Sequence, residues 1–174
     1  MNAFVVSWLD YCNGLLVGLP DKQLNRLQAV MNAAARLICR GRRYGHITPL
    51  PRDQLHWLRS YERGTFKMCV MVYKALHDMA PSSINDRCVL VATNTRRSSL
   101  RSATDGQLVV SRTSTNAGDQ AFAVIGPQAW NKQTAYIRQS PSLETSKRNL
   151  KTHLFTVSCL DTAPLWLLYN NMAR

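Results

Sequence analysis

The segment from residue 9 to residue 40 constrains the fold most, because it joins a punctuated turn to a long amphipathic helix. Gly18 and Pro20 end one helical pattern, and Asp21 is the predicted N-cap of the next. Beyond it, apolar residues recur at helical spacing, so the helix needs a core to pack on. These apolar positions are Leu24, Leu27, Val30, Met31, Ala34, Leu37 and Ile38. The basic side chains fall largely outside that stripe, which leaves them on the solvent side of the helix.

The rest of the first half also has helical patterns. Apolar spacing predicts a helix over residues 2–16, which would pack against the helix over residues 21–40 as an antiparallel hairpin. A short helical turn is predicted over residues 53–58. A third long helix is predicted over residues 61–78, and one further turn over residues 81–88. The first half is therefore expected to be helical.

The second half has a mixed pattern. Residues 107–112 are β-like, and residues 120–125 are expected to pair with them through a polar turn, as a β-hairpin. Ser142 is the predicted cap of a C-terminal helix over residues 140–155. The predicted fold class is mainly α: a helical hairpin plus a third long helix, then a smaller mixed segment with the hairpin and the C-terminal helix. The predicted divisions are a helical segment over 1–88, a Ser/Thr/Arg-rich connection over 89–106, the mixed segment over 107–158 and a tail over 159–174.

Positive charge dominates the composition. The chain of 174 residues has 22 Lys and Arg against 10 Asp and Glu, a formal net charge of +12. Such an excess favours association with nucleic acid or an anionic membrane, although it is also compatible with an inert basic surface. The basic residues are spread along the chain and are not gathered in one tail. Distributed charge on folded elements suits contacts along a phosphate backbone.

Two groups of basic residues are the candidate phosphate contacts. The first crowds at the predicted end of the helix over residues 21–40, where its charges either contact phosphate or only stabilise the helix dipole. This group comprises Arg36, Arg40, Arg42 and Arg43, with Lys67 as a further candidate. The second lies in the Ser-rich connection, which either closes on RNA or stays disordered, and comprises Arg96, Arg97 and Arg101. Trp57 and Trp130 could stack on bases, but their aliphatic neighbours favour core positions.

The five cysteines are widely spaced and include no Cys-x-x-Cys pair. Together with the four histidines they form no zinc-ligand pattern, so no metal site and no cofactor is predicted. Cys39 and Cys69 lie on apolar helix faces and are expected in the core. An odd cysteine count without a secretory signal indicates reduced thiols inside the cell, in the nucleus or the cytoplasm, and not a secreted protein. No apolar run approaches the roughly 18–20 residues that span a bilayer, so no membrane insertion is expected.

Short blocks of the sequence carry a family resemblance. They are LDYCN, GLP, LQ and NAAARLI within residues 9–38, YGHITPL and LHWL within 44–58, VYKALHDMAP at 72–81, RSSLR at 97–101, LVVSR at 108–112, GDQAF at 118–122, GPQAWN at 126–131 and KRNLKTHLF at 147–155. In these blocks the chain resembles the region that follows the polymerase domain in LINE-type, non-LTR retrotransposon reverse transcriptases of the jockey and Rex-like groups. The resemblance covers most of the chain, in the same order and at similar spacing.

The resemblance implies that the chain helps to hold template RNA or target DNA after the polymerase thumb. The polymerase domain of the parent protein is then a further expected partner. Catalysis is not implied, because an RNA-directed DNA polymerase holds two magnesium ions with clustered carboxylates, which in reverse transcriptases include two adjacent aspartates. This chain has no Asp-Asp pair and lacks the length for fingers and palm. We therefore predict no catalytic residue.

Two alternatives stay open at this point. The chain could be a helical interaction module that docks on another protein through residues 24–38 or 166–169. It could also be a translated transposon relic with no selected activity. Unburied apolar surface would favour the first, and a disrupted polymerase reading frame upstream would favour the second.

Overall fold

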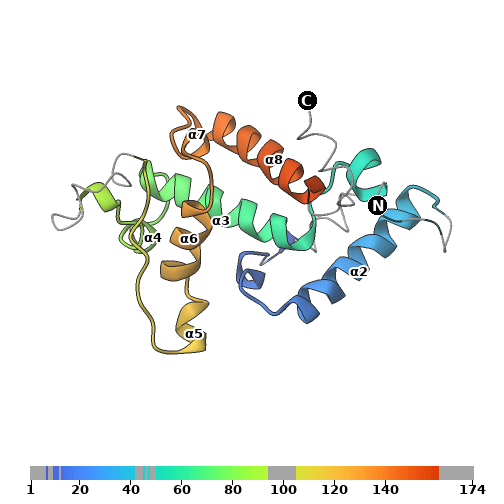
Figure 1. Cartoon of the computed structure of the whole chain (residues 1–174), viewed down its shortest axis with the longest axis horizontal. Coiled ribbons are helices and arrows are strands. Elements are labelled where there is room, and N and C mark those ends of the chain that lie inside the picture. Colours follow the sequence, from blue (N-terminus) through green and yellow to red (C-terminus); the bar gives the residue numbers. More distant parts are fainter. Residues whose placement is uncertain are drawn as a thin grey trace, which may run out of the picture.

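The computed structural model is mainly helical in the residues that it describes, which confirms the mainly α class that was predicted. It describes residues 7, 10, 11, 13–41, 45, 47, 50–93 and 105–160. The three long helices are α2 (Asp21–Ile38), α3 (Ser60–Leu76) and α8 (Leu143–Leu160). Figure 1 shows α3 at the centre, with α8 running beside it and α2 meeting its first turns.

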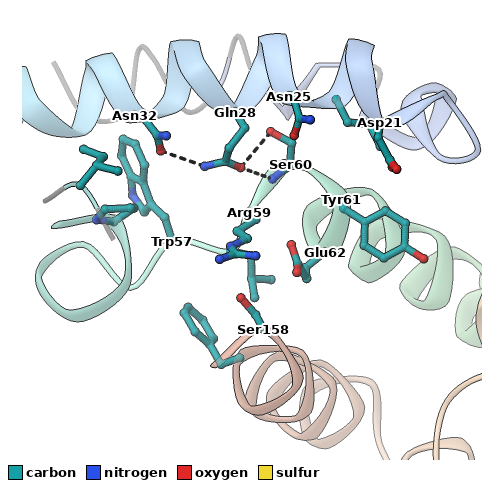
Figure 2. Close-up of a pocket in the computed structure, with 15 residues that line it drawn as sticks. Asp21, Asn25, Gln28, Asn32, Trp57, Arg59, Ser60, Tyr61, Glu62 and Ser158 are labelled. Atoms are coloured by element: carbon teal, nitrogen blue, oxygen red, sulfur yellow. Dashed lines mark hydrogen bonds between the residues drawn. The ribbon is translucent and has the colours of Figure 1, made fainter. Parts of the chain in front are cut away.

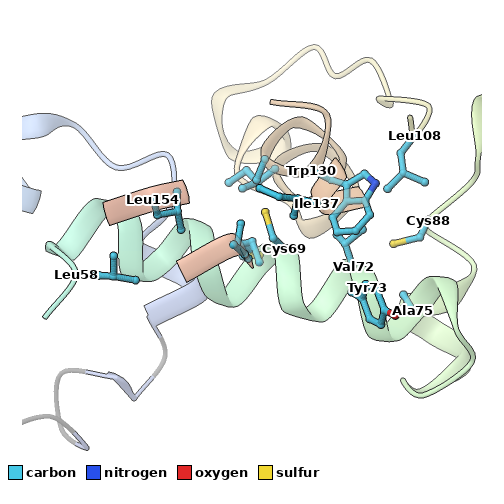
Figure 3. Close-up of a cluster of buried hydrophobic side chains, with 14 residues drawn as sticks. Leu58, Cys69, Val72, Tyr73, Ala75, Cys88, Leu108, Trp130, Ile137 and Leu154 are labelled. Carbon is cyan, nitrogen blue, oxygen red and sulfur yellow. The ribbon is translucent and has the colours of Figure 1, made fainter. Parts of the chain in front are cut away.

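The main hydrophobic core is built around α3 (Figure 3). Cys69, Val72 and Tyr73 of α3 are almost fully buried, with contacts from α8 and from α6 (Phe122–Asn131). The core is completed by Leu58, Met68, Ala75, Cys88, Leu108, Ile125, Ala129, Trp130, Ile137, Leu150 and Leu154. Trp130 is only 1% exposed, so its predicted core position is confirmed.

A close approach brings α6 onto α3. A Cβ added at Gly126 would lie 3.3 Å from a Val72 methyl carbon and 3.0 Å from the Phe122 ring. Since real Cβ atoms rarely make contacts this short, the absence of a side chain at Gly126 allows the two helices to pack at this distance. The glycine in the GPQAWN block therefore has a packing role.

The first arm of the predicted helical hairpin, residues 2–16, lies largely outside the described residues. Its described end forms a 3-10 turn, η1 (Asn13–Leu16), which packs against α3. The next helix, α2, begins one residue earlier than predicted, because Pro20 and not Asp21 is the N-cap. The Pro20 carbonyl accepts the first helical hydrogen bonds, from the backbone N–H groups of Gln23 and Leu24.

The apolar face of α2 is narrower than predicted. Met31, Ala34 and Ala35 pack with Trp57 in a second buried cluster, which confirms the core position of Trp57. Val30 and Leu37, by contrast, are 54% and 73% exposed, so their predicted burial is wrong. The physical reason is that α2 packs on one side only, against the start of α3 and the residues that precede it.

The connections in the first half are short helical turns. A π-helical turn, η2 (Leu50–Gln54), lies a few residues before the turn predicted over 53–58, and residues 56–59 then lead without helix into α3. The predicted third helix is confirmed as α3, and α4 (Ser82–Asn85) confirms the turn predicted over 81–88. A 3-10 turn, η3 (Val91–Thr93), follows, and residues 94–104 of the predicted connection lie outside the described residues.

The predicted β-hairpin is wrong. Residues 122–125, part of the second predicted strand, form the first turn of α6, and Leu108 instead makes an isolated antiparallel bridge with Leu90. A short apolar run is compatible with either a strand or a helix, and here burial decides. Because Ile125, Ala129 and Trp130 all reach the core around α3, the run is buried at helical spacing.

Two neighbouring side chains of α6 hold the segment over residues 106–108 in place. The Asn131 side chain donates to the Leu108 carbonyl and accepts from the Leu108 N–H, both at 2.8 Å. The Trp130 indole N–H donates to the Gly106 carbonyl at 3.0 Å. The Asn131 side chain thus makes the two hydrogen bonds with Leu108 that the backbone of a neighbouring strand would make. The pair Trp130 and Asn131 therefore has a structural function.

The remaining helices are α5 (Asn116–Asp119), α7 (Ala135–Arg138) and α8. The predicted cap of α8 is confirmed, because Ser142 Oγ accepts from the Thr145 N–H at 3.2 Å. Across the described ranges, no helix combines the length and apolar character needed to cross a membrane.

We predict that replacing Asn131 by Ala lowers the free energy of unfolding. The substitution leaves the buried Leu108 backbone without two hydrogen-bond partners. The expected loss is about 1–3 kcal/mol. Urea denaturation followed by circular dichroism measures it. Gln128→Ala, at an exposed position of the same helix, is the control, and an equal effect of both substitutions would contradict this role of Asn131.

We also predict that native Cys69 resists alkylation. Burial raises the pKa of its thiol to about 12, so the reactive thiolate is almost absent at pH 8. The measurement is treatment with iodoacetamide followed by peptide mass spectrometry. Cys69 should stay unmodified in the folded protein. It should be modified in roughly 8 M urea, a concentration used for complete unfolding. Labelling of native Cys69 as fast as half-buried Cys39 would contradict the described core.

Candidate nucleic-acid interface

The structure describes three of the eight predicted phosphate contacts. Arg36, Arg40 and Lys67 are described, and the other five candidates lie outside the described residues. Those five are Arg42, Arg43, Arg96, Arg97 and Arg101. Their predicted role stays a prediction.

Arg36 and Arg40 belong to the end of α2 but have different surroundings. Arg36 is half-buried in the last turn, and its Nε atom is buried without a hydrogen-bond partner among the described residues. Arg40 follows the helix, is exposed, and has a positive φ of 51°. Gly41 then closes the helix end, because its N–H donates to the Arg36 carbonyl at 2.8 Å. Of these two arginines, only Arg40 is exposed to solvent.

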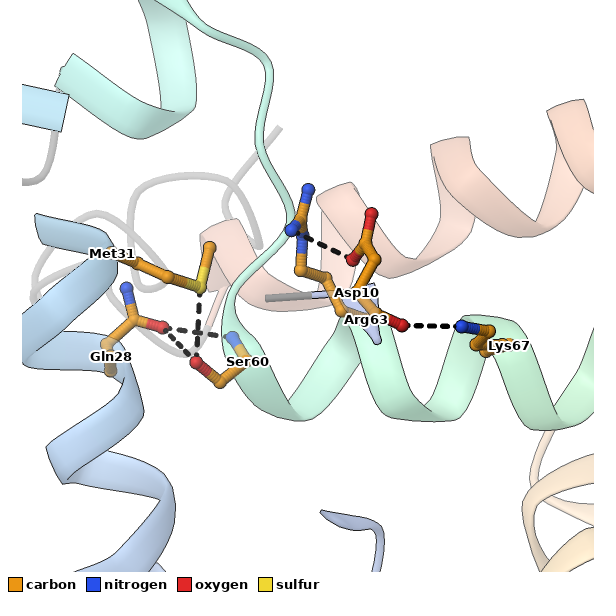
Figure 4. Close-up of polar contacts among 6 residues, drawn as sticks. All are labelled: Asp10, Gln28, Met31, Ser60, Arg63 and Lys67. Carbon is orange, nitrogen blue, oxygen red and sulfur yellow. Dashed lines mark hydrogen bonds and ion pairs between the residues drawn. The ribbon is translucent and has the colours of Figure 1, made fainter. Parts of the chain in front are cut away.

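Lys67 takes part in a contact that the sequence pattern did not indicate. Its Nζ atom donates to the backbone carbonyl of Asp10 at 2.6 Å (Figure 4). One turn earlier on α3, Arg63 pairs with the Asp10 carboxylate at 3.0 Å, and its guanidinium carbon lies 5.9 Å from the centroid of a Trp57 ring. Burial lowers the pKa of Arg63, and the charge of Asp10 partly offsets this. Lys67 and Arg63 therefore hold Asp10 against α3.

Exposed cations also lie at positions that were not among the predicted contacts. Lys22 and Arg26 are exposed one turn apart on the outside of α2, and no ion pair joins either of them to a residue that the structure describes. On α8, Arg148 and Lys151 are likewise exposed, whereas Lys147 is paired with Glu144 at 2.7 Å. We refer to Lys22, Arg26 and Arg40 as the outer cations of α2.

A cavity of about 430 Å³ lies on another side of α2, between this helix, the start of α3 and the last turns of α8 (Figure 2). Its wall on α2 includes three amide side chains, Asn25, Gln28 and Asn32, at spacing i, i+3 and i+7. This spacing puts all three on one face of the helix. We call this cavity the amide cleft. Its other described lining residues are Asp21, Leu24, Ile47, Pro51, Trp57, Leu58, Arg59, Ser60, Tyr61, Glu62, Phe155 and Ser158.

Gln28 organises the cleft through its hydrogen bonds. Its Oε1 accepts from the Ser60 backbone N–H at 3.0 Å, and its Nε2 donates to Asn32 Oδ1 at 3.0 Å (Figure 4 shows the contact with Ser60). Ser60 is the first residue of α3, and Arg59 before it provides no side-chain cap. The first N–H groups of a helix have no partner within the helix. Gln28 therefore caps α3 from a different helix and fixes the orientation of Asn32.

The charges of the cleft differ from those of the outer surface of α2. Its described lining contains two carboxylates, Asp21 and Glu62, and one guanidinium, Arg59. Figure 2 shows Arg59 pointing into the cleft between Trp57 and Glu62. Glu62 is only 7% exposed. The cleft thus offers polar groups without an excess of positive charge.

Sequence reasoning missed the amide cleft. The spacing of Asn25, Gln28 and Asn32 is visible in the sequence, but it is also typical of an ordinary solvated helix face. Nothing in the sequence indicated that α3 would begin opposite these amides. Across the described residues, no group of three or more His, Cys, Asp or Glu side chains is placed to hold a metal ion.

Comparison with protein-family models, with curated proteins and with solved structures found no match to this chain.

We predict that Gln28→Ala destabilises the junction between α2 and α3. The substitution removes the acceptor for the Ser60 N–H, which is buried at the start of α3. The free energy of unfolding should fall by about 1–2 kcal/mol, as for the loss of other helix caps. Thermal unfolding followed by circular dichroism measures the change. Gln23→Ala, at an exposed position of α2, is the matched control and should leave the stability almost unchanged.

Proposed function

We propose that this chain is a non-catalytic piece of the C-terminal region of a LINE-type reverse transcriptase, and that it binds RNA or DNA through phosphate contacts. The blocks of sequence resemblance support the family. The proposal assigns no chemical step to the chain, because it has no adjacent aspartates of the kind that hold magnesium in these polymerases.

The observation that carries the binding role is the exposure of the outer cations of α2. Lys22, Arg26 and Arg40 are solvent-exposed, and none of them forms an ion pair with a described residue. Like charges one helical turn apart, as at Lys22 and Arg26, destabilise an isolated helix. A polyanion removes this repulsion, because each phosphate contact neutralises one cation and releases a counterion. Such contacts carry no base information, so little sequence preference is expected from them.

We predict steep salt dependence for binding of a random single strand. Fluorescence anisotropy with a labelled oligonucleotide, measured over a series of salt concentrations, gives the slope of log K against log salt. Lys22→Gln combined with Arg26→Gln should reduce the magnitude of this slope by about 1–2, since each single-strand phosphate contact contributes roughly 0.7.

The control is a variant with the same change in net charge elsewhere, Lys132→Gln with Lys147→Gln. Lys147 is already paired with Glu144, so this variant should change the slope less. Absence of binding by the unmodified chain at low salt would overturn the proposed function. Equal slopes for both double variants would show that the outer cations of α2 are not the contact surface.

A second function is favoured by one observation, the exposure of Val30 and Leu37 on α2. Apolar side chains of this size on the outside of a helix suit docking on another protein, such as the polymerase domain of the parent. Light scattering distinguishes this function, because the interaction module should self-associate as concentration rises. Val30→Ser with Leu37→Ser should then abolish the self-association.

A further inference from the structure

We infer that the amide cleft binds one unstacked nucleobase of the nucleic acid whose phosphates the outer cations of α2 contact. This inference rests on the proposed function and adds a base-binding site to it. Phosphate contacts alone would give no preference for a strand with bases over one without them. A base site predicts such a preference.

The hydrogen-bonding groups of the cleft are suited to a base edge. Gln28 forms hydrogen bonds with Ser60 and Asn32, so it holds this wall of the cleft in place. Asn32 uses its Oδ1 toward Gln28, and no hydrogen bond joins its amide nitrogen to a described residue. Asn25 is exposed and forms no side-chain hydrogen bond within the described part of the chain. An amide offers a donor and an acceptor side by side, which is the pattern that pairs in a bidentate way with a base edge.

An aromatic side chain lines the cleft on its α3 side. Tyr61, the second residue of α3, lines the cleft and is 49% exposed. Trp57 lines it as well but is mostly buried in the second core cluster, so it forms a fixed wall. Bases that have left the stack are commonly held by aromatic stacking together with hydrogen bonds to their edges. Tyr61 and Asn25 provide these two kinds of contact at the same cleft.

The described lining of the cleft suits a neutral base better than a phosphate. It contains the carboxylates of Asp21 and Glu62 and the guanidinium of Arg59, and so offers no excess of positive charge. A neutral base does not require such an excess. The volume of about 430 Å³ lies within the range of small-molecule sites.

A cation suited to the attached phosphate lies just beyond the cleft. Arg36 follows Asn32 by four residues, so it continues the amide face of α2 about 6 Å further along the helix. Arg36 is half-buried, so part of its side chain remains accessible to solvent. A nucleotide with its base in the cleft can thus place a phosphate toward Arg36.

The test compares two labelled oligonucleotides of equal length, one with ordinary bases and one with an abasic sugar-phosphate backbone. The unmodified chain should bind the base-bearing strand more tightly. Asn25→Ala should reduce this preference about 3- to 10-fold, the size expected for one or two hydrogen bonds. Tyr61→Leu, which removes the stacking face, should reduce it as well. Gln23→Ala, on the same helix but away from the cleft, should leave the preference unchanged.

The outcomes separate this inference from the proposed function. Equal binding of both strands by the unmodified chain would overturn the base site and leave the phosphate contacts in place. A preference that survives both Asn25→Ala and Tyr61→Leu would also overturn it. No binding of either strand would overturn the proposed function and, with it, the base site. Asn25 and Tyr61 are exposed, and circular dichroism melting of each variant tests that its fold is intact.

Discussion

Burial of one long face of α3 is the constraint on which the rest of the structure depends. Cys69, Val72 and Tyr73 are nearly inaccessible to solvent, and helices from the second half of the chain cover them. Contacts distant in sequence therefore hold the fold together, and the Tyr73 hydroxyl adds one by donating to the Ser140 carbonyl at 3.0 Å. Because α3 is fixed in this way, its first turn becomes a rigid edge on which α2 can be positioned.

Much of the fold could be predicted from the sequence where local pattern and tertiary burial agree. The third helix and the Ser142 cap of α8 are such cases, since helical spacing and capping chemistry act over a few residues. The strand predicted over residues 120–125 is wrong because the spacing of a short apolar run fits either a strand or a helix. Contact with α3 favours the helix here. The predicted burial of Val30 and Leu37 is wrong for a related reason. Apolar spacing shows which side chains could be buried, but not how wide a surface the neighbouring elements cover.

The candidate site was less predictable than the fold, because charge identifies a class of partner without identifying a surface. Charge alone predicts Lys67 as a phosphate contact, yet the structure gives it a backbone contact with Asp10. Lys22 and Arg26 are not among the predicted contacts, although they are exposed on the outside of α2. The amide cleft could not be found from sequence, since it exists only where Gln28 meets Ser60 at a separation of 32 residues.

The same helix therefore presents two chemically different faces, and the hydrogen bond between Gln28 and Ser60 links the cleft face to the fold. Charge acts at long range and tolerates small displacements, so the outer cations need only the helix itself. Hydrogen bonds to a base edge require atoms placed within a few tenths of an ångström of their best geometry, so the cleft needs a fixed junction between α2 and α3. If Gln28 is lost, recognition of bases should weaken before recognition of phosphate does. Stability at this junction and selectivity in the cleft are then two consequences of one contact.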